Sequence, residues 1–283
     1  MNTPIVNQNA AMPKKKVAPP VLELKQLSRH FGGLKAVNKV DLTIQANSLT
    51  GLIGPNGSGK TTIFNVITGI YEPTSGDVIL NDQVINGLEP YVINQMGIAR
   101  TFQNIRLFPN LTVLDNVRIA YHPHAGYDLK DSLFHTANFN QKEKELTEKA
   151  QDFLSIFGLQ DHQADIAKNL PYGEQRRLEI ARALASTPRL LLLDEPAAGM
   201  NPQESIELMD LIHFIRERFN LTVLLIEHQM RVVMGICEYI TVMDFGEVIC
   251  RGTPQDVQCD PKVIEAYLGL GAAALSKGYL RKC

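Results

Sequence analysis

One stretch of this sequence, Gly54 to Thr62, limits the possible folds more than any other feature. An apolar run from Leu49 to Ile53 precedes it, and from Ile63 to Ile70 apolar side chains recur at helical spacing. The stretch itself matches the pattern G-x-x-x-x-G-K-T, as Gly54-Pro55-Asn56-Gly57-Ser58-Gly59-Lys60-Thr61-Thr62. Strand, glycine-rich loop and helix in this order predict a loop that binds phosphate groups.

The residue types in this loop explain how it would hold an anion. Gly54, Gly57 and Gly59 can adopt backbone angles closed to other residues, so that successive N–H groups converge on one point. A helix beginning near Lys60 adds unpaired amides and the positive end of its dipole. Lys60 is expected to reach the β- and γ-phosphates, and the Thr61 hydroxyl to bind Mg²⁺. A glycine-rich turn with a solvated lysine is the alternative, but every motif position is matched, so we predict binding of a nucleoside triphosphate.

Two further apolar runs each end in ionisable residues. The run from Arg189 to Leu193 is typical of a parallel strand buried on both faces, and Asp194 and Glu195 follow it. Open α/β sheets bind ligands at the carboxyl ends of such strands. We therefore expect Asp194 to hold Mg²⁺ through water and Glu195 to accept a proton from attacking water, although two surface acids could also end a strand. His228, which follows Glu227 at the end of the apolar run 221–226, is a candidate contact of the γ-phosphate, although a lone histidine at such a place is more often a capped structural residue.

The region before the loop predicts antiparallel strands and an aromatic contact for the base. Residues 21–27 and 37–44 alternate as half-buried strands do, with a turn at 30–33 between them. Phe31 in that turn is placed to stack on a purine, because an aromatic ring packs against its π-face; an ordinary core position is the alternative.

The remaining pattern alternates strands with helices. We expect strands at 76–81, 98–103, 240–243 and 248–250, the last two forming a hairpin, and helices at 90–95, 113–120, 141–157, 173–185, 203–218 and 261–268. The fold class is therefore α/β: a P-loop NTPase (RecA-like) core with an antiparallel β edge.

Composition excludes several classes of protein. Its 28 basic and 30 acidic residues give a net charge of −2, which does not favour nucleic acid or anionic membrane as a partner. No apolar run approaches the roughly 18 residues needed to cross a bilayer. We interpret the four cysteines, which lack C-x-x-C spacing, as free thiols in a reducing compartment. Residues 1–20, with a Lys14–Lys16 cluster, are expected to form a disordered tail and residues 269–283 a weakly ordered one, on either side of a domain at 21–268.

Together these motifs resemble the ATP-binding subunit of an ABC transporter over about residues 21–268. The resemblance implies an inserted ABC helical subdomain at about 101–187, ATP and Mg²⁺ as ligands, and ATP hydrolysis. It implies that Phe31 stacks on adenine, that Gln103 is the lid glutamine that senses Mg²⁺ and the γ-phosphate, that Glu195 is the catalytic base, and that His228 is the switch histidine. Leu170, Pro171, Tyr172, Gly173, Glu174 and Gln175 resemble the signature motif, which acts in trans on the ATP of a partner subunit.

Two positions depart from the family pattern. Pro171 stands where the signature serine is usual and offers neither hydroxyl nor N–H, so the amides near Gly173 would cap the phosphate. Asn201 stands where the interface loop usually has an aspartate, which keeps hydrogen bonding but removes a charge. Neither change touches Lys60, Asp194 or Glu195, and we expect hydrolysis to survive.

Longer strings resemble the branched-chain amino-acid importer subfamily: HFGGLKAVNKVDL, RTFQNIRLFPNLTVLDNV, LPYGEQRRLEIARAL, LLLDEPAAGMNP and LLIEHQMRVVMGI. The resemblance implies two integral-membrane permease subunits, a second ATPase subunit or a copy of this chain as dimer partner, and, indirectly, a substrate-binding protein. It implies a peripheral location on the cytoplasmic face of the inner membrane and no nucleic-acid partner. Lipopolysaccharide-export and urea ABC transporters are the near alternatives; a DNA-repair ATPase would carry long coiled-coil insertions.

Overall fold

The computed structural model describes residues 19–121 and 136–268. Residues 1–18 and 269–283 lie outside this description, so the expected tails do too. Within the described residues the first strand, β1, begins at Pro20, one residue before the predicted start.

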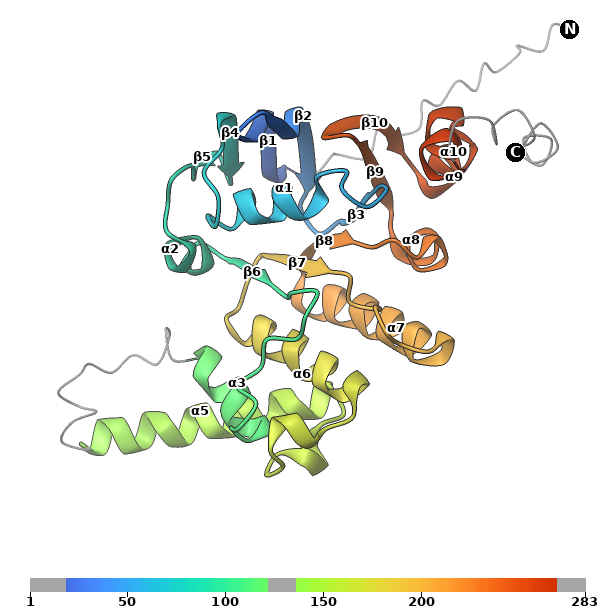
Figure 1. Cartoon of the computed structure of the whole chain (residues 1–283). Helices are drawn as coiled ribbons and strands as arrows, with labels where there is room; N and C mark the ends of the chain where they lie inside the picture. The colour runs from blue at the N-terminus through green and yellow to red at the C-terminus, as the bar shows by residue number, and fades with distance from the viewer. Residues whose placement is uncertain (1–18, 122–135, 269–283) are drawn as a thin grey trace, which may run out of the picture.

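The amino-terminal part of the domain forms a small antiparallel sheet. Its strands are β1 (Pro20–Phe31), β2 (Leu34–Gln45), β4 (Ser75–Leu80) and β5 (Gln83–Val84), in the spatial order β2-β1-β4-β5. The first two strands are longer than predicted, since His30 and Phe31 still pair with Lys35 and Leu34 and the turn contracts to two glycines. The antiparallel part is thus a separate sheet above the core rather than only an edge (Figure 1).

A larger sheet carries the predicted parallel core, in the order β10-β9-β3-β8-β7-β6. The parallel members are β3 (Leu49–Ile53), β6 (Ile98–Arg100), β7 (Leu190–Asp194), β8 (Thr222–Ile226) and β9 (Tyr239–Asp244); β10 (Glu247–Gly252) closes one edge antiparallel to β9. The order follows from hydrophobicity: β3, β7 and β8 are buried throughout and take the interior of the sheet.

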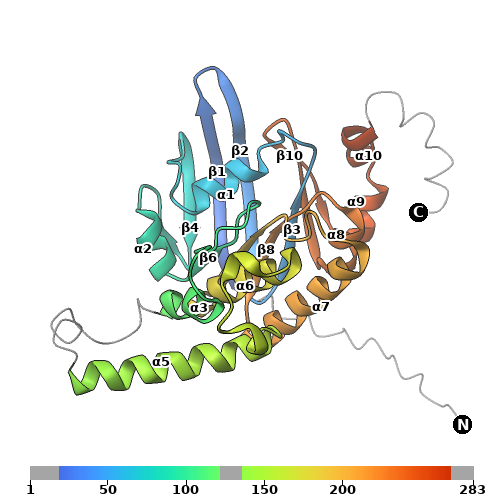
Figure 2. The ribbon, with the colours of Figure 1, turned by 60° about the horizontal axis from the view of Figure 1, so that its bottom comes forward.

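Successive side chains along the strands of the large sheet pack alternately into two hydrophobic cores, one on each face. Leu190 and Leu192 pack into the core that contains the antiparallel sheet and helix α1 (Lys60–Ile67). Leu191 and Leu193 point to the opposite face, into the core that contains the remaining main helices. Helix α1 therefore lies between the two sheets (Figures 1 and 2), and the loop before it is fixed from both sides.

The other helices, except the one that carries Ile93 and packs on the side of α1, cover the opposite face and one end. Helix α6 (Tyr172–Ala185) packs with α3 (Val113–Tyr121) and α5 (Ala137–Ile156), and these three lie together away from the antiparallel sheet (Figure 2). Two short 3₁₀ turns, at Gln160–His162 and Ala167–Asn169, lead into α6. The remaining helices are α2 (Pro90–Gln95), α7 (Pro202–Phe219), α8 (Met230–Ile236), α9 (Pro254–Cys259) and α10 (Pro261–Leu268).

Several predicted bounds were wrong. Strand β6 ends at Arg100 instead of Gln103, because the chain beyond it leaves the sheet to contact α6. Helix α1 stops at Ile67, since Gly69 takes a positive φ of 74°. Helices α8 and α9 were not expected. Cys237 and Cys250 are free, as predicted.

Candidate functional site

The loop at residues 54–62 is held in a shape that only glycine permits at two positions. Gly59 has φ 101°, and a Cβ there would lie 2.3 Å from the carbonyl oxygen of Ala36. At Gly54, φ is 150° and a Cβ would lie 2.1 Å from the carbonyl oxygen of Met243. The antiparallel sheet and strand β9 therefore press against the loop directly, and a methyl group at either glycine would push the loop out of place.

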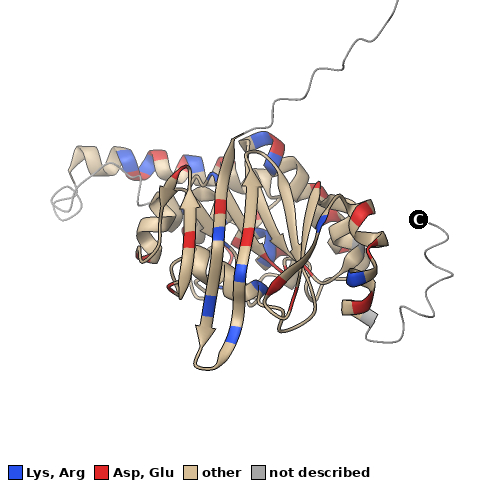
Figure 3. Cartoon of the chain, turned by 90° about the horizontal axis from the view of Figure 1, so that it is seen from above, with Lys and Arg blue, Asp and Glu red and all other residues tan. Residues whose placement is uncertain are grey.

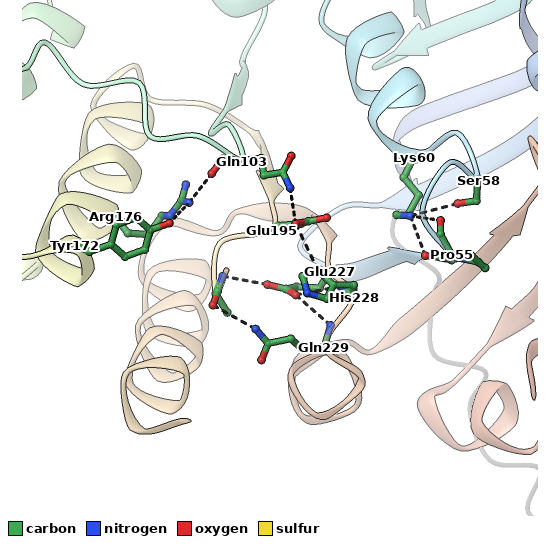
Figure 4. A network of polar contacts seen from close by, with 12 residues as sticks. Pro55, Ser58, Lys60, Gln103, Tyr172, Arg176, Glu195, Glu227, His228 and Gln229 are labelled. Carbon is green, nitrogen blue, oxygen red and sulfur yellow. Dashed lines mark hydrogen bonds and ion pairs between the residues drawn. The ribbon is translucent and has the colours of Figure 1, made fainter. Parts of the chain in front are cut away.

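The first amides of α1 are arranged as an anion site. Ile63 N donates the first hydrogen bond of the helix, to Gly59 O at 3.0 Å, so the amides of residues 60–62 precede the bonded part of the helix. Lys60 Nζ curls back to the loop and donates to the carbonyl oxygens of Gly54 and Pro55, both at 2.8 Å (Figure 4). Burial lowers the pKa of Lys60, while the carboxylates of Glu195 and Asp194 act in the opposite direction.

A cavity of about 480 Å³ lies beside this loop. Its lining joins parts of the chain that are far apart in sequence: Phe31, Leu34, Lys35, Ala36, Asn56, Gly57, Gly59, Lys60, Thr61, Thr62, Gln103, Glu195 and Phe245. Phe31 is 39% exposed, and the guanidinium of Arg29 lies 4.7 Å from its ring centroid. Tyr71 meets the same ring edge-on at 5.2 Å. These contacts orient Phe31 at the cavity wall and leave part of its surface open.

Three predicted residues meet at the carboxyl ends of β7 and β8. Gln103 Nε2 donates to Glu195 Oε2 at 2.9 Å, and His228 Nδ1 lies 3.5 Å from the same oxygen (Figure 4). Glu195 has φ 47°, in the left-handed region, which turns its side chain from the end of β7 toward the other two residues. Gln103 and His228 thus contact Glu195 from different loops.

Asp194 lies next to this group but is buried, with 3% of its surface exposed. Arg100 Nη2 donates to its Oδ2 at 2.7 Å, and Arg100 Nη1 donates to Asn65 Oδ1 at 2.7 Å. Burial raises the pKa of Asp194, while the Arg100 guanidinium opposes that rise. The arginine therefore ties β6, β7 and α1 together at the aspartate.

Sequence reasoning missed Glu227, a fully buried carboxylate that orders two loops. Its Oε1 accepts from Ala197 N at 3.0 Å, and its Oε2 accepts from His228 N at 3.1 Å and Gln229 N at 3.3 Å (Figure 4). Burial raises the pKa of Glu227, and these backbone donors act against the rise. Its place between a buried strand and His228 was the available signal.

The predicted signature residues form the entry to α6. Pro171 is the N-cap, and Gln175 fastens the turn through Nε2, which donates to Leu170 O at 2.8 Å. Tyr172 is 44% exposed, and a Cβ placed on Gly173 would meet nothing within 4 Å. Within the described residues, none of the positions 170–175 lines the cavity beside the loop. The structure thus brings Phe31, the loop, Gln103 and Glu195 to one cavity and leaves the signature turn facing elsewhere.

The described residues could hold the expected Mg²⁺ together with phosphate oxygens, but not by protein side chains alone. They contain no group of three or more His, Cys, Asp or Glu side chains placed to hold a metal ion. Thr61 and Gln103 do line the same cavity, with Asp194 at the end of β7 close by, and such a set of oxygen donors suits Mg²⁺ shared with phosphate oxygens. Among the helices described for residues 19–121 and 136–268, none has the length and apolarity to cross a bilayer.

Comparison with known proteins gives consistent matches. A family model described as "ABC transporter" matches residues 37–198, and one described as "Branched-chain amino acid ATP-binding cassette transporter" matches residues 247–273. The high-affinity branched-chain amino acid transport ATP-binding protein LivG of Escherichia coli K12 is 46% identical over 250 residues, covering 88% of this chain and 98% of LivG. The lipopolysaccharide export system ATP-binding protein LptB of the same organism is 33% identical, covering 88% of this chain and 97% of LptB.

Solved structures agree with the fold. The ADP conformation of an ATP-binding cassette of an ABC transporter superposes with a TM-score of 0.78 at 32% identity, covering 89% of this chain and all of that one. A dimeric ATP-binding cassette bound to ADP and phosphate, in a post-hydrolysis state, superposes with a TM-score of 0.69 at 26% identity, covering 82% of this chain and 98% of that one. The predicted P-loop NTPase core is therefore confirmed.

Proposed function

This chain belongs to the ABC transporter family of ATP-binding subunits, which hydrolyse ATP, and we propose that it powers the import of branched-chain amino acids through partner permeases. The single observation that carries the ATPase part is the convergence of the 54–62 loop, Gln103 and Glu195 on one cavity. The substrate part is supported by the carboxyl-terminal family match and by the higher identity to LivG than to LptB.

We assign nucleotide binding to the residues that line this cavity. The amides of the 54–62 loop hold the phosphates, and Lys60 exchanges its bonds to the carbonyls of Gly54 and Pro55 for phosphate oxygens. Phe31, oriented by Arg29, stacks on the adenine. Thr61, Gln103 and Asp194 would hold Mg²⁺, which when bound neutralises charge on the phosphates.

Hydrolysis follows from the contacts of Glu195. Its carboxylate accepts the proton of the attacking water, while Gln103 and His228 hold Oε2 in place from either side. Glu227 accepts a hydrogen bond from the backbone amide of His228 and so fixes the position of that residue, from which the imidazole can contact the γ-phosphate. Glu195 and His228 with Lys60 are therefore the proposed catalytic set.

A second ATPase subunit completes the site. The turn at Leu170–Gln175 does not line this chain's own cavity, and its unobstructed Gly173 leaves room for an approaching phosphate. We infer that it caps the ATP of a partner, either a homologous subunit or a second copy, as the dimeric cassette structure supports. Asn201 keeps its place as N-cap of α7, where its side chain accepts from Gln203 N and Glu204 N, so loss of the usual aspartate charge does not disturb the helix start.

Partner permeases would bind the side of the molecule where the helical subdomain, proposed at about 101–187, meets the core. A cavity of about 260 Å³ there is lined by residues of α2, β6, α3 and α6 and by Phe108 in the loop before α3; Phe108 and Ile119 are 44% and 37% exposed. A recess in which these two apolar side chains lie beside Arg100 and Arg182 suits a short amphipathic helix of a membrane subunit. The proposal makes the chain a peripheral subunit at the cytoplasmic face of the inner membrane, with a substrate-binding protein acting indirectly.

The charge distribution gives no support for a nucleic-acid partner. Over the antiparallel sheet acidic positions lie among the basic ones, and the whole chain carries a net charge of −2 (Figure 3). Lipopolysaccharide export remains the second candidate, because LptB is also a relative.

The test is to identify the partners and then the cargo. The tagged chain would be purified from detergent-solubilised native membranes and its companions identified by mass spectrometry. Two different permeases and a second ATPase, followed by loss of leucine uptake in Lys60→Ala, are expected. Export permeases with a periplasmic bridge would replace the import proposal, and absence of any membrane partner would overturn the transport role.

A further inference from the structure

Arg176, in the second turn of α6, is fully buried and makes four polar contacts. Its Nη1 donates to Phe102 O at 2.7 Å and its Nη2 to Gln103 O at 2.8 Å. The same guanidinium pairs with Glu179 Oε2 at 2.7 Å. It also contacts the Tyr172 hydroxyl at 3.1 Å (Figure 4). Two of these contacts go to the main chain of the loop that carries Gln103.

Glu179, one turn further along α6, completes the contact from the other side. It is 3% exposed, and its Oε1 accepts from Arg106 N at 3.0 Å and from Phe102 N at 3.4 Å. The pair therefore satisfies donors and acceptors of the 102–106 backbone, which has left the sheet after Arg100 and has no strand partner there.

A general role in stability does not account for this arrangement. A buried ion pair is weak evidence for stability, because desolvating both charges offsets much of their attraction. What the planar fork of an arginine does supply is fixed geometry toward two neighbouring carbonyl oxygens. The pair thus specifies where the 102–106 backbone lies relative to α6.

We propose that Arg176 and Glu179 are positioning residues that clamp the 102–106 loop to α6, so that Gln103 and the signature turn move as one body. This rests on the proposed function, in which Gln103 reads this chain's ATP while residues 170–175 cap the partner's. Gln103 contacts Glu195 at 2.9 Å at one end of the clamp, and Tyr172 contacts Arg176 at the other. Occupancy of one ATP site is then transmitted to the second through the clamp.

Arg176→Lys separates positioning from folding. The lysine keeps a charge for Glu179, but a single ammonium group cannot reproduce the fork that holds both Phe102 O and Gln103 O. Arg176→Gln, which also removes the charge, is the stronger second variant. Arg177→Lys is the matched control. Arg177 is the next residue of α6, and its guanidinium pairs on the protein surface with Glu207 of α7 at 2.8 Å.

The first readout is amide hydrogen exchange of residues 102–106 in the full-length chain without nucleotide. We expect exchange to rise about tenfold in Arg176→Lys and more in Arg176→Gln, with the control at the parent rate, since a lost clamp permits local opening. Parent-like exchange in both Arg176 variants would overturn the clamp, whether or not the chain hydrolyses ATP.

The second readout is the cooperativity of MgATP binding, measured by equilibrium dialysis in a Glu195→Gln background so that turnover does not interfere. We expect the Hill coefficient to approach 2 in the parent and about 1 in Arg176→Lys, with the affinity for the first ATP within about twofold. Raised exchange with unchanged cooperativity, or a parent coefficient of 1, would overturn the transmission role. Absence of hydrolysis in the wild-type chain would instead overturn the proposed function.

Discussion

Arg100 Nη2 lies 2.7 Å from Asp194 Oδ2, and the side chains of both residues are at least 95% buried. The guanidinium also reaches Asn65 on α1 and lies 4.8 Å from the centroid of the Phe102 ring. A residue expected to bind Mg²⁺ is thus held by a cation from an adjacent strand. This contact unites the phosphate-loop helix with the acidic end of β7.

Replacement of Arg100 by Met should leave a buried carboxylate without its partner. We expect the free energy of unfolding to fall by about 3–5 kcal/mol, the cost of breaking a buried pair from one side. Urea denaturation followed by circular dichroism measures this. Arg177→Met, which breaks only the exposed pair with Glu207, should cost about 1 kcal/mol or less. Equal losses in the two variants would contradict the structural role of Arg100.

Glu195→Gln should stop hydrolysis and preserve binding. The amide keeps an oxygen that can accept from Gln103 Nε2 but cannot take a proton, and a positioned general base contributes about 10²–10⁴-fold to rate. Single-turnover hydrolysis measures the loss of chemistry. Gel filtration with MgATP should show a long-lived ATP-bound dimer. Rapid turnover by this variant would remove Glu195 from its assigned role.

Phe31→Ala should weaken ATP binding without slowing chemistry. Loss of an aromatic contact worth about 0.5–1.5 kcal/mol predicts a two- to tenfold higher KM for ATP at unchanged kcat. Phe31→Tyr should restore the parent value. The control is Tyr91→Ala, an aromatic that is 67% exposed on α2 and does not line the cavity. A lowered kcat at normal KM would place Phe31 outside base binding.

Glu227 should make stability depend on pH. Burial raises its pKa in the folded state, so between the unfolded and folded values the folded chain binds more protons and its stability falls as pH rises. The parent should therefore lose free energy of unfolding relative to Glu227→Gln as pH is raised from about 4.5, the ordinary value, to 8. Urea denaturation at stepped pH measures the difference, with exposed Glu148→Gln as control. A pH-independent difference would refute the assignment.

Local sequence was sufficient to predict an element where one short segment contains all the residues that determine its conformation. The 54–62 loop, α2 at Pro90–Gln95 and the buried strands β3, β7 and β8 were predicted because a short run of residues fixes glycine conformation, capping or burial by itself. The same holds for Glu195 and His228, which follow strands that read as buried. Bounds failed at β6 and α1, where contacts with α6 and a positive φ at Gly69 override propensity.

By itself, therefore, the sequence determined a glycine-rich loop between a strand and a helix, a buried parallel strand that ends in acids, and a helix start near residue 172 that resembles the signature motif. Only the tertiary structure decided what holds them: Arg100 on Asp194, Glu227 on the amide of Ala197, and Arg176 with Glu179 on the Gln103 loop. These partners lie on different segments of the chain from the groups that they hold. Charge pairing between distant segments has no period or spacing in sequence, because it depends on how strands and helices are packed and not on their local conformation.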